Sequence, residues 1–257
     1  MTQEAVEALR TEHDTILAAA ESWAPDQWEA PSACAGWRVQ DLMVHMATVL
    51  QQVVDPSTLP PVDQSLPFER QLDQMVDALR ELTPDEALSR YRDVGKRAID
   101  ALEGLQAMDS PIDLGELGTF PLHMLANAYA FDAYTHMRAD LLKPRGPIDG
   151  EVPPATDGQL NASMDWMFTG MPTMSRATLE PIKETVNMSI DGPGARTVNV
   201  TAGSVEEGSS PDAAATITST APDFVLWATK RESPDGRVRI EGDQEVGKRF
   251  AEALNIF

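Results

Sequence analysis

The chain has 257 residues, enough for one large domain or two modest ones, and its 42% apolar and 24% charged residues are typical of a globular protein. Its 41 acidic and 20 basic residues give a formal net charge of −21, which repels phosphate backbones and anionic lipids and so argues against nucleic-acid and membrane partners. The single cysteine, Cys34, excludes an intramolecular disulfide and a multi-cysteine zinc site.

The N-terminal segment has neither the basic start nor the apolar run of a signal peptide. No stretch approaches the roughly 20 apolar residues that a membrane-spanning helix needs. Together with the low cysteine content, these features predict a cytoplasmic protein.

Four segments in the first part of the chain have apolar residues at spacings of three and four, which is typical of amphipathic helices. Between the first two lies a loop rich in Pro, Ala, Ser and Trp, and prolines between positions 56 and 67 interrupt the chain after the second. The third opens with a capping box at Thr83. An antiparallel four-helix bundle is the simplest way to bury four apolar stripes together. The predicted helices cover residues 6–23, 38–54, 83–108 and 119–142.

The pattern changes after Pro144. A Pro- and Gly-rich stretch over residues 144–158 is followed by segments in which apolar and polar residues alternate, as in half-buried strands. The sequence therefore predicts a four-helix bundle over 1–145 and a smaller α+β domain over 155–257. In the second domain we expect helices over 159–170, 223–230 and 244–254, a hairpin of strands 185–190 and 197–202, and strands over 213–218 and 237–241.

Asp132 and His136 are the strongest candidates for a chemical role. They are four residues apart in a helical pattern, so their side chains project from one face about 5–6 Å apart. The apolar stripe that contains Leu125 and Tyr129 continues into both residues, which places them toward the bundle interior. A buried carboxylate is costly unless it is paired or binds a metal.

His45 lies at the edge of the apolar stripe of the second predicted helix, one turn from Leu42 and Val49. Together with Asp132 and His136 it would form a two-histidine, one-carboxylate set with open coordination positions, as catalytic metal sites have. By spacing alone, Asp132 and His136 are more often an exposed or structural hydrogen-bonded pair, and a residue such as His45 is more often a satisfied interior histidine.

A family resemblance bears on this choice. Residues 28–45, with the run Gly-Trp-Arg-Val-Gln-Asp-Leu from Gly36, resemble the entry to the second helix in the mycothiol-dependent maleylpyruvate isomerase family, a branch of the DinB-like metal-binding bundles. In that family the run ends in a metal-ligating histidine, which maps onto His45. Residues 131–136 resemble the fourth-helix motif, whose acidic residue and histidine supply two further ligands.

The resemblance thus implies His45, Asp132 and His136 as metal ligands; the isomerase itself has a glutamate where this chain has Asp132. Residues 223–227 and 236–243 are similar to the end of sterol-carrier-like domains, which the family joins to the bundle. The resemblance implies an enzyme in which a divalent metal, zinc as the first choice, activates the low-molecular-weight thiol mycothiol. The thiol would add to a small electrophilic substrate, giving cis-trans isomerisation or S-transfer.

Other residues are weaker candidates. Asp140 could accept the second ring N–H of His136, although a solvated acid at a helix end is the commoner case. We expect His13 and His123 to be structural and Cys34 to be a buried, inert thiol, since it has no basic neighbour in sequence. Surface charge is the expected role of Arg231, Arg237 and Arg239.

Two other functions remain open at this point. The sterol-carrier-like half could make the chain a lipid or hydrophobic-ligand binding protein, and a metal-free bundle could be an interaction scaffold. Neither the substrate nor the assembly state follows from the residues, and a monomer or a homodimer is expected.

Overall fold

A computed structural model describes residues 2–256 of the chain. The chain divides into two compact units. The first extends to Ile112 and resumes over Phe120–Ala155, and the second contains Asp113–Thr119 and continues from Thr156. The predicted domain limits at residues 145 and 155 stay a prediction. Among the described residues, no helix has both the length and the apolar character that crossing a bilayer requires.

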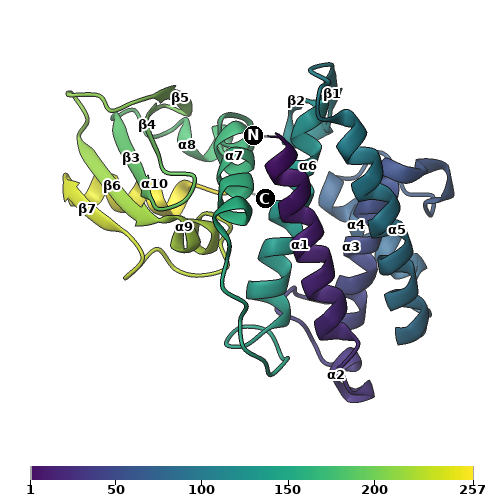
Figure 1. Ribbon diagram of the computed structural model, residues 1–257. Coiled ribbons are helices and arrows are strands. Elements are labelled where there is room, and N and C mark those ends of the chain that lie inside the picture. Colours follow the sequence, from purple (N-terminus) through teal and green to yellow (C-terminus); the bar gives the residue numbers. More distant parts are fainter. Residues whose placement is uncertain (1, 257) are drawn as a thin grey trace. The chain divides into compact units, whose positions relative to one another are not determined.

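The first unit is built from long helices that lie side by side (Figure 1). Each of the four predicted segments is helical, and Thr83 forms the predicted capping box with Glu86 at the start of the third. The last helix passes into a π-helix, His136–Leu141. The long helices are α1 (Thr2–Ala20), α3 (Val39–Val54), α5 (Pro84–Leu105) and α6 (Leu125–Thr135).

The fourth helix begins later than predicted. Residues Thr119–Pro121 form strand β2, which pairs with β1 (Pro111–Asp113), and a 3-10 turn over Leu122–Met124 leads into α6. Gly115 and Gly118 both have positive φ, which side chains disfavour, and they close the hairpin between the two strands. The hairpin therefore uses residues that the sequence pattern had assigned to the helix.

Two helices of the first unit were not predicted. The short α2 (Pro25–Glu29) lies within the predicted loop, and α4 (Phe68–Ala78) follows Pro67. The second of these buries Leu72 and Met75 against Val49, and Phe68 packs against the same cluster. The first unit thus contains more than the four predicted helices, and their antiparallel four-helix arrangement stays a prediction.

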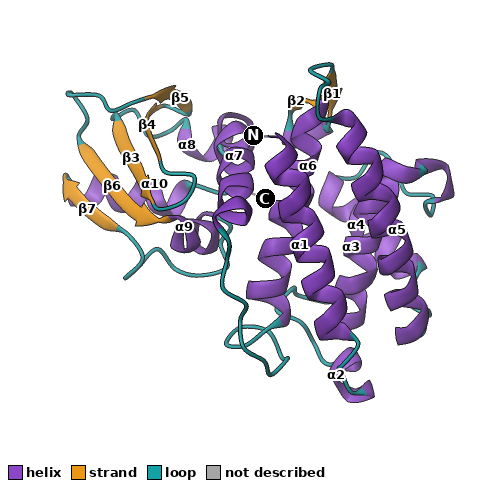
Figure 2. Cartoon of the chain, in the orientation of Figure 1, coloured by secondary structure: helices purple, strands orange, loops and turns teal. Residues whose placement is uncertain are grey.

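The second unit contains a five-stranded sheet in the order β5-β4-β3-β6-β7 (Figure 2). The predicted hairpin is confirmed: Val186 lies opposite Val200 and Ile190 opposite Arg196. Strands β3 and β6 are parallel, and the other pairs are antiparallel. The strands are β3 (Val186–Asp191), β4 (Arg196–Thr201), β5 (Ser204–Glu207), β6 (Ala215–Thr220) and β7 (Arg239–Gly242).

Alternate residues of the sheet are buried, including Met188 and Ile217, so one face packs inward as the alternating pattern predicts. The predicted helices of this unit are present with shifted ends. The observed order of a helical unit followed by an α+β unit confirms the predicted fold class. The helices are α7 (Asp157–Met174), α8 (Arg176–Leu179), α9 (Ala221–Ala228) and α10 (Gln244–Ala253).

Candidate metal centre

The start of α3 is held in place by Asp41. Its carboxylate accepts the backbone N–H of Arg38 at 2.9 Å and two guanidinium hydrogen bonds from the same residue at 3.1 and 2.8 Å. Burial alone would raise the pKa of Asp41, but these bonds and the charges of Arg38 and Arg80 hold it below its ordinary value. Since His45 lies one turn further along α3, this anchored start fixes the direction of its side chain.

The three sequence-predicted residues come together in the first unit. His136 Nε2 lies 3.2 Å from Asp132 Oδ1, and His45 Nε2 lies 3.5 Å from the same oxygen. One ligand atom from each residue lies within 4.8 Å of those of the other two. Residues from two helices that are far apart in sequence therefore point toward a common point.

The distances suit a small divalent cation. A tetrahedral ion with metal–nitrogen bonds of about 2.0–2.1 Å needs ligand atoms about 3.3–3.4 Å apart. The two distances to Asp132 Oδ1, 3.2 and 3.5 Å, lie on either side of that value. Imidazole nitrogen and carboxylate oxygen are donors that zinc, iron, cobalt and nickel accept.

The electrostatics of the cluster formed by His45, Asp132 and His136 also favour a bound cation. Burial would raise the pKa of Asp132, but the charge of His136 and hydrogen bonds from both imidazoles bring it far below its ordinary value. Conversely, burial would lower the pKa of His136, but Asp132 and then Asp140 raise it well above the usual range. Asp132 thus needs a positive partner, which can be an imidazolium or a metal ion.

Access to the cluster is uneven. The side chains of His45 and His136 are 6% and 9% exposed, whereas that of Asp132 is 28% exposed. The half-buried ring of Trp37 lies against His45, with ring centroids 4.9 Å apart. The imidazoles are therefore shielded, and the carboxylate is the part of the cluster that an incoming molecule can reach.

Asp140 is not the solvated acid that the sequence favours. It is 1% exposed, and its Oδ2 accepts a hydrogen bond from His136 Nδ1 at 2.8 Å. The reason is that residues after Leu142 fold back: Ile148 N donates to Leu141 O at 3.0 Å, and Gly146 packs tightly against the Leu141 carbonyl. The carboxylate is thereby enclosed rather than left at an open helix end.

Cys34 is half-buried, and its Sγ lies 3.9 Å from His136 Nδ1. Cys34 has no basic neighbour in sequence, but the loop before α3 brings it to a histidine that is remote in sequence. The predicted inertness of the thiol stays a prediction. The amide of Ala33 donates to Asp140 O at 3.1 Å and ties the loop to the π-helix. Cys34, His136 and Asp140 form a second set of ligand atoms within 4.8 Å of one another.

The remaining candidates lie outside the cluster, and their expected structural or surface-charge roles stay predictions. His13 is buried with its Nε2 3.2 Å from the Tyr91 carbonyl, and His123 Nδ1 lies 3.1 Å from Asp109. In the second unit Arg237 pairs with Asp223 at 2.6 Å, and Arg239 with Glu241 at 2.9 Å.

The fold and the cluster define a helical unit with two histidines and one carboxylate at a common point, joined to an α+β unit. The chain belongs to the mycothiol maleylpyruvate isomerase family. Residues 9–141 match the mycothiol maleylpyruvate isomerase N-terminal domain, and residues 161–249 match the C-terminal domain of the same family. The predicted family is confirmed, and it is a family of enzymes.

Two solved isomerase structures agree with this assignment at the level of the fold. The structure of a mycothiol-dependent maleylpyruvate isomerase is 15% identical in sequence to this chain, with a TM-score of 0.53. The match covers 94% of this chain and 93% of the isomerase chain. A point mutant of such an isomerase is 14% identical with a TM-score of 0.52, with the same coverage. Sterol carrier protein 2 like 2 from Aedes aegypti is 14% identical over 35% of this chain and 98% of its own, with a TM-score of 0.30. No curated protein matches the chain.

Proposed function

We propose that His45, Asp132 and His136 hold one divalent metal ion, with zinc as the first choice. The observation that carries the proposal is the convergence of their three ligand atoms within 4.8 Å of one another. Three protein ligands leave a coordination position for an exogenous molecule, which is the arrangement of catalytic rather than structural zinc sites.

Mycothiol is the proposed thiol cosubstrate, since the family and the solved relatives are named for dependence on it. A divalent cation held by these residues would favour the thiolate form of a thiol at the open position and would thereby supply a nucleophile. In this chain Asp132 balances the positive charge, the two buried imidazoles and Trp37 limit access by water, and the exposed part of Asp132 marks the side of approach.

The proposed reaction is addition of the thiol to a small electrophilic substrate with an activated double bond. Addition, rotation and elimination would convert a cis alkene into its trans isomer. The solved relatives are named as isomerases of maleylpyruvate. If elimination does not follow, the thiol stays on the product, and the reaction is an S-transfer.

The test is turnover of maleylpyruvate by the zinc-loaded protein with mycothiol. We expect formation of the trans isomer that stops on chelation and returns with added metal. His45→Ala and His136→Ala should abolish turnover, whereas His123→Ala, which removes a histidine outside the cluster, should retain it. Turnover that survives chelation, or that both cluster variants retain, contradicts the proposal.

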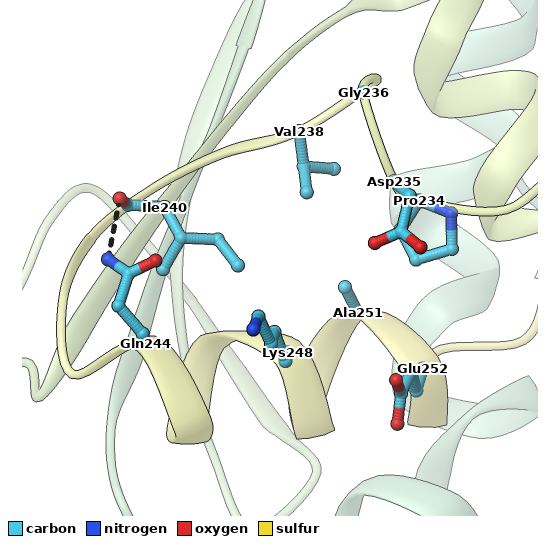
Figure 3. Close-up of a pocket in the computed structure, with 9 residues that line it drawn as sticks. All are labelled: Pro234, Asp235, Gly236, Val238, Ile240, Gln244, Lys248, Ala251 and Glu252. Atoms are coloured by element: carbon cyan, nitrogen blue, oxygen red, sulfur yellow. Dashed lines mark hydrogen bonds between the residues drawn. The ribbon is translucent and has the colours of Figure 1, made fainter.

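The lipid-binding alternative has less support. Figure 3 shows the residues that line a hollow between α10 and the segment from Pro234 to Ile240, among them Asp235 and Lys248. The volume of this hollow is about 170 Å³. Pockets for drug-sized ligands usually measure about 300–1,000 Å³ and are mostly apolar. A larger hollow of about 470 Å³ is lined by the charged Arg176, Glu180 and Lys183. Both linings mix apolar with charged side chains, and a lipid chain needs a mostly apolar lining.

A cytoplasmic location and a monomeric or homodimeric state stay predictions. The proposed partners are the small thiol and its electrophilic substrate. Mass spectrometry of ligands extracted from the purified protein tests the lipid-binding alternative, which requires a co-purified fatty acid or sterol that persists in His45→Ala.

A further inference from the structure

His136 lies between two carboxylates of its own helix. Asp132, four residues earlier, faces Nε2 at 3.2 Å, and Asp140, four residues later, accepts from Nδ1 at 2.8 Å. The two oxygens therefore occupy opposite edges of one imidazole ring. Asp140 lies within the π-helix, a feature that is frequent at functional sites.

We propose that Asp140 is a positioning residue for the metal centre, an inference that rests on the proposed function. By holding the proton on Nδ1, its carboxylate leaves the Nε2 lone pair of His136 directed at the common point with His45 and Asp132. A carboxylate partner of this kind fixes the tautomer and ring orientation of a ligating histidine and increases its basicity.

The structure holds Asp140 itself in place. Its backbone carbonyl accepts the amide of Ala33 at 3.1 Å, and Arg145 Nη2 lies 3.9 Å from its Oδ1. Gly146 packs so closely on the carbonyls of Asp140 and Leu141 that a Cβ there would clash. Asp140 is therefore held in place by contacts with both its backbone and its side chain.

His45 differs from His136 in this respect. Among the described residues, none forms a hydrogen bond with its buried Nδ1. The ring of Trp37, with its centroid 4.9 Å away, is its neighbour instead. Only one of the two proposed imidazole ligands thus has a charged partner on its second nitrogen, so a large effect on metal binding is expected from Asp140.

A competing interpretation places a metal on the other edge of His136, among Cys34 Sγ, Nδ1 and Asp140. The observed geometry favours the hydrogen bond. A separation of 2.8 Å between Nδ1 and Oδ2 is that of a charge-assisted N–H···O bond, and a cation on Nδ1 would have to replace its proton. The thiol, 3.9 Å from Nδ1, lies only at the outer limit of a hydrogen bond to sulfur.

The experiment measures metal affinity by chelator competition and the visible spectrum of the Co²⁺-loaded protein. We expect Asp140→Ala to weaken binding by about 10- to 100-fold and to shift the ligand-field bands, because loss of such a partner commonly has effects of this size. Asp140→Asn keeps the shape of the side chain and an acceptor oxygen, so it should fold even if the alanine variant does not. Its metal affinity should be about 10-fold lower than that of the wild type.

Two variants serve as controls. Asp165→Asn removes an acid that is ion-paired with Arg196 in the second unit, and Cys34→Ala removes the thiol beside His136. Both variants should bind the metal with an affinity within about 3-fold of the wild-type value and should leave the Co²⁺ spectrum unchanged.

The outcomes separate the two proposals. Unchanged affinity and spectrum in both Asp140 variants overturn the positioning role while leaving the metal centre intact. The positioning role is also overturned if Cys34→Ala and Asp140→Ala lose the metal while His45→Ala retains it. That result would place the metal among Cys34, His136 Nδ1 and Asp140. A wild-type protein that binds neither Zn²⁺ nor Co²⁺ contradicts the proposed function itself.

Discussion

The imidazole rings of His45 and His136 stand nearly perpendicular to each other, with centroids 5.1 Å apart and an interplanar angle of 83°. Both turn Nε2 toward Asp132 Oδ1, at 3.5 and 3.2 Å. Rings set at such an angle can direct two lone pairs at one point without contact between their faces. The arrangement is the basis of the metal proposal.

Removing the charge of Asp132 tests the role of the carboxylate. Asp132→Asn keeps the shape but takes away the anion that two buried imidazoles face. We expect metal affinity to fall by more than the roughly 10- to 100-fold that loss of an outer partner costs, measured by competition with a chelator. Wild-type affinity in this variant would show that the ion binds elsewhere.

Chelation should lower thermal stability. A ligand that binds only the folded state at 100 times its Kd stabilises it by about 2.7 kcal/mol, and in a chain of this size each kcal/mol shifts Tm by about 2–4 °C. We therefore expect a fall of about 5–10 °C on metal removal, measured by calorimetry. His136→Ala should show no such fall, while His123→Ala should keep it; a chelator-insensitive Tm in the wild type supports a metal-free scaffold instead.

Acid should weaken the start of α3. Because the pKa of folded Asp41 lies below its ordinary value, its contribution to stability is fully present above that ordinary value and is lost as pH falls through the folded pKa. The free energy of unfolding of the metal-free protein, measured in urea, should therefore decline below about pH 4. This decline should be smaller in Asp41→Asn. At pH 7 this variant should be less stable by about 1–3 kcal/mol, since a buried charged acceptor is lost. An identical pH profile in both proteins would exclude this role.

Two glycine substitutions separate stability from metal binding. A Cβ at Gly146 would meet the Leu141 carbonyl beside Asp140, and a Cβ at Gly95 would meet the His13 ring away from the cluster. Each alanine variant should lose about 1–3 kcal/mol in urea unfolding, because both positions become overpacked. Only Gly146→Ala should also weaken metal binding. Equal metal affinity in the two variants would mean that the 142–148 segment does not support the centre.

Helical periodicity placed the three candidate residues toward the bundle interior, and the family resemblance identified them as candidate ligands. His45 shares the period of Leu42 and Val49, and Asp132 and His136 share one face of their own helix, so their convergence follows from burying both apolar stripes. The α4 helix was missed although Leu72 and Met75 have helical spacing, because the prolines before it indicated a loop.

The surroundings of the cluster depend on contacts that no local pattern encodes. Cys34 reaches His136 only through the fold of the loop before α3, and Asp140 is buried by the returning segment after Leu142. The β1–β2 hairpin likewise depends on the positive φ values of Gly115 and Gly118, in a stretch whose Thr-Phe-Pro run is typical of a helix start. Sequence periodicity reports which face of an element is buried, but not what a loop brings to it.

The most direct test is a crystal structure of the zinc-loaded protein with anomalous data collected on both sides of the zinc absorption edge. We expect one anomalous peak within about 2.0–2.2 Å of His45 Nε2, His136 Nε2 and a carboxylate oxygen of Asp132. A peak bonded to Cys34 and His136 Nδ1, or no peak in the first unit at full zinc loading, would contradict it.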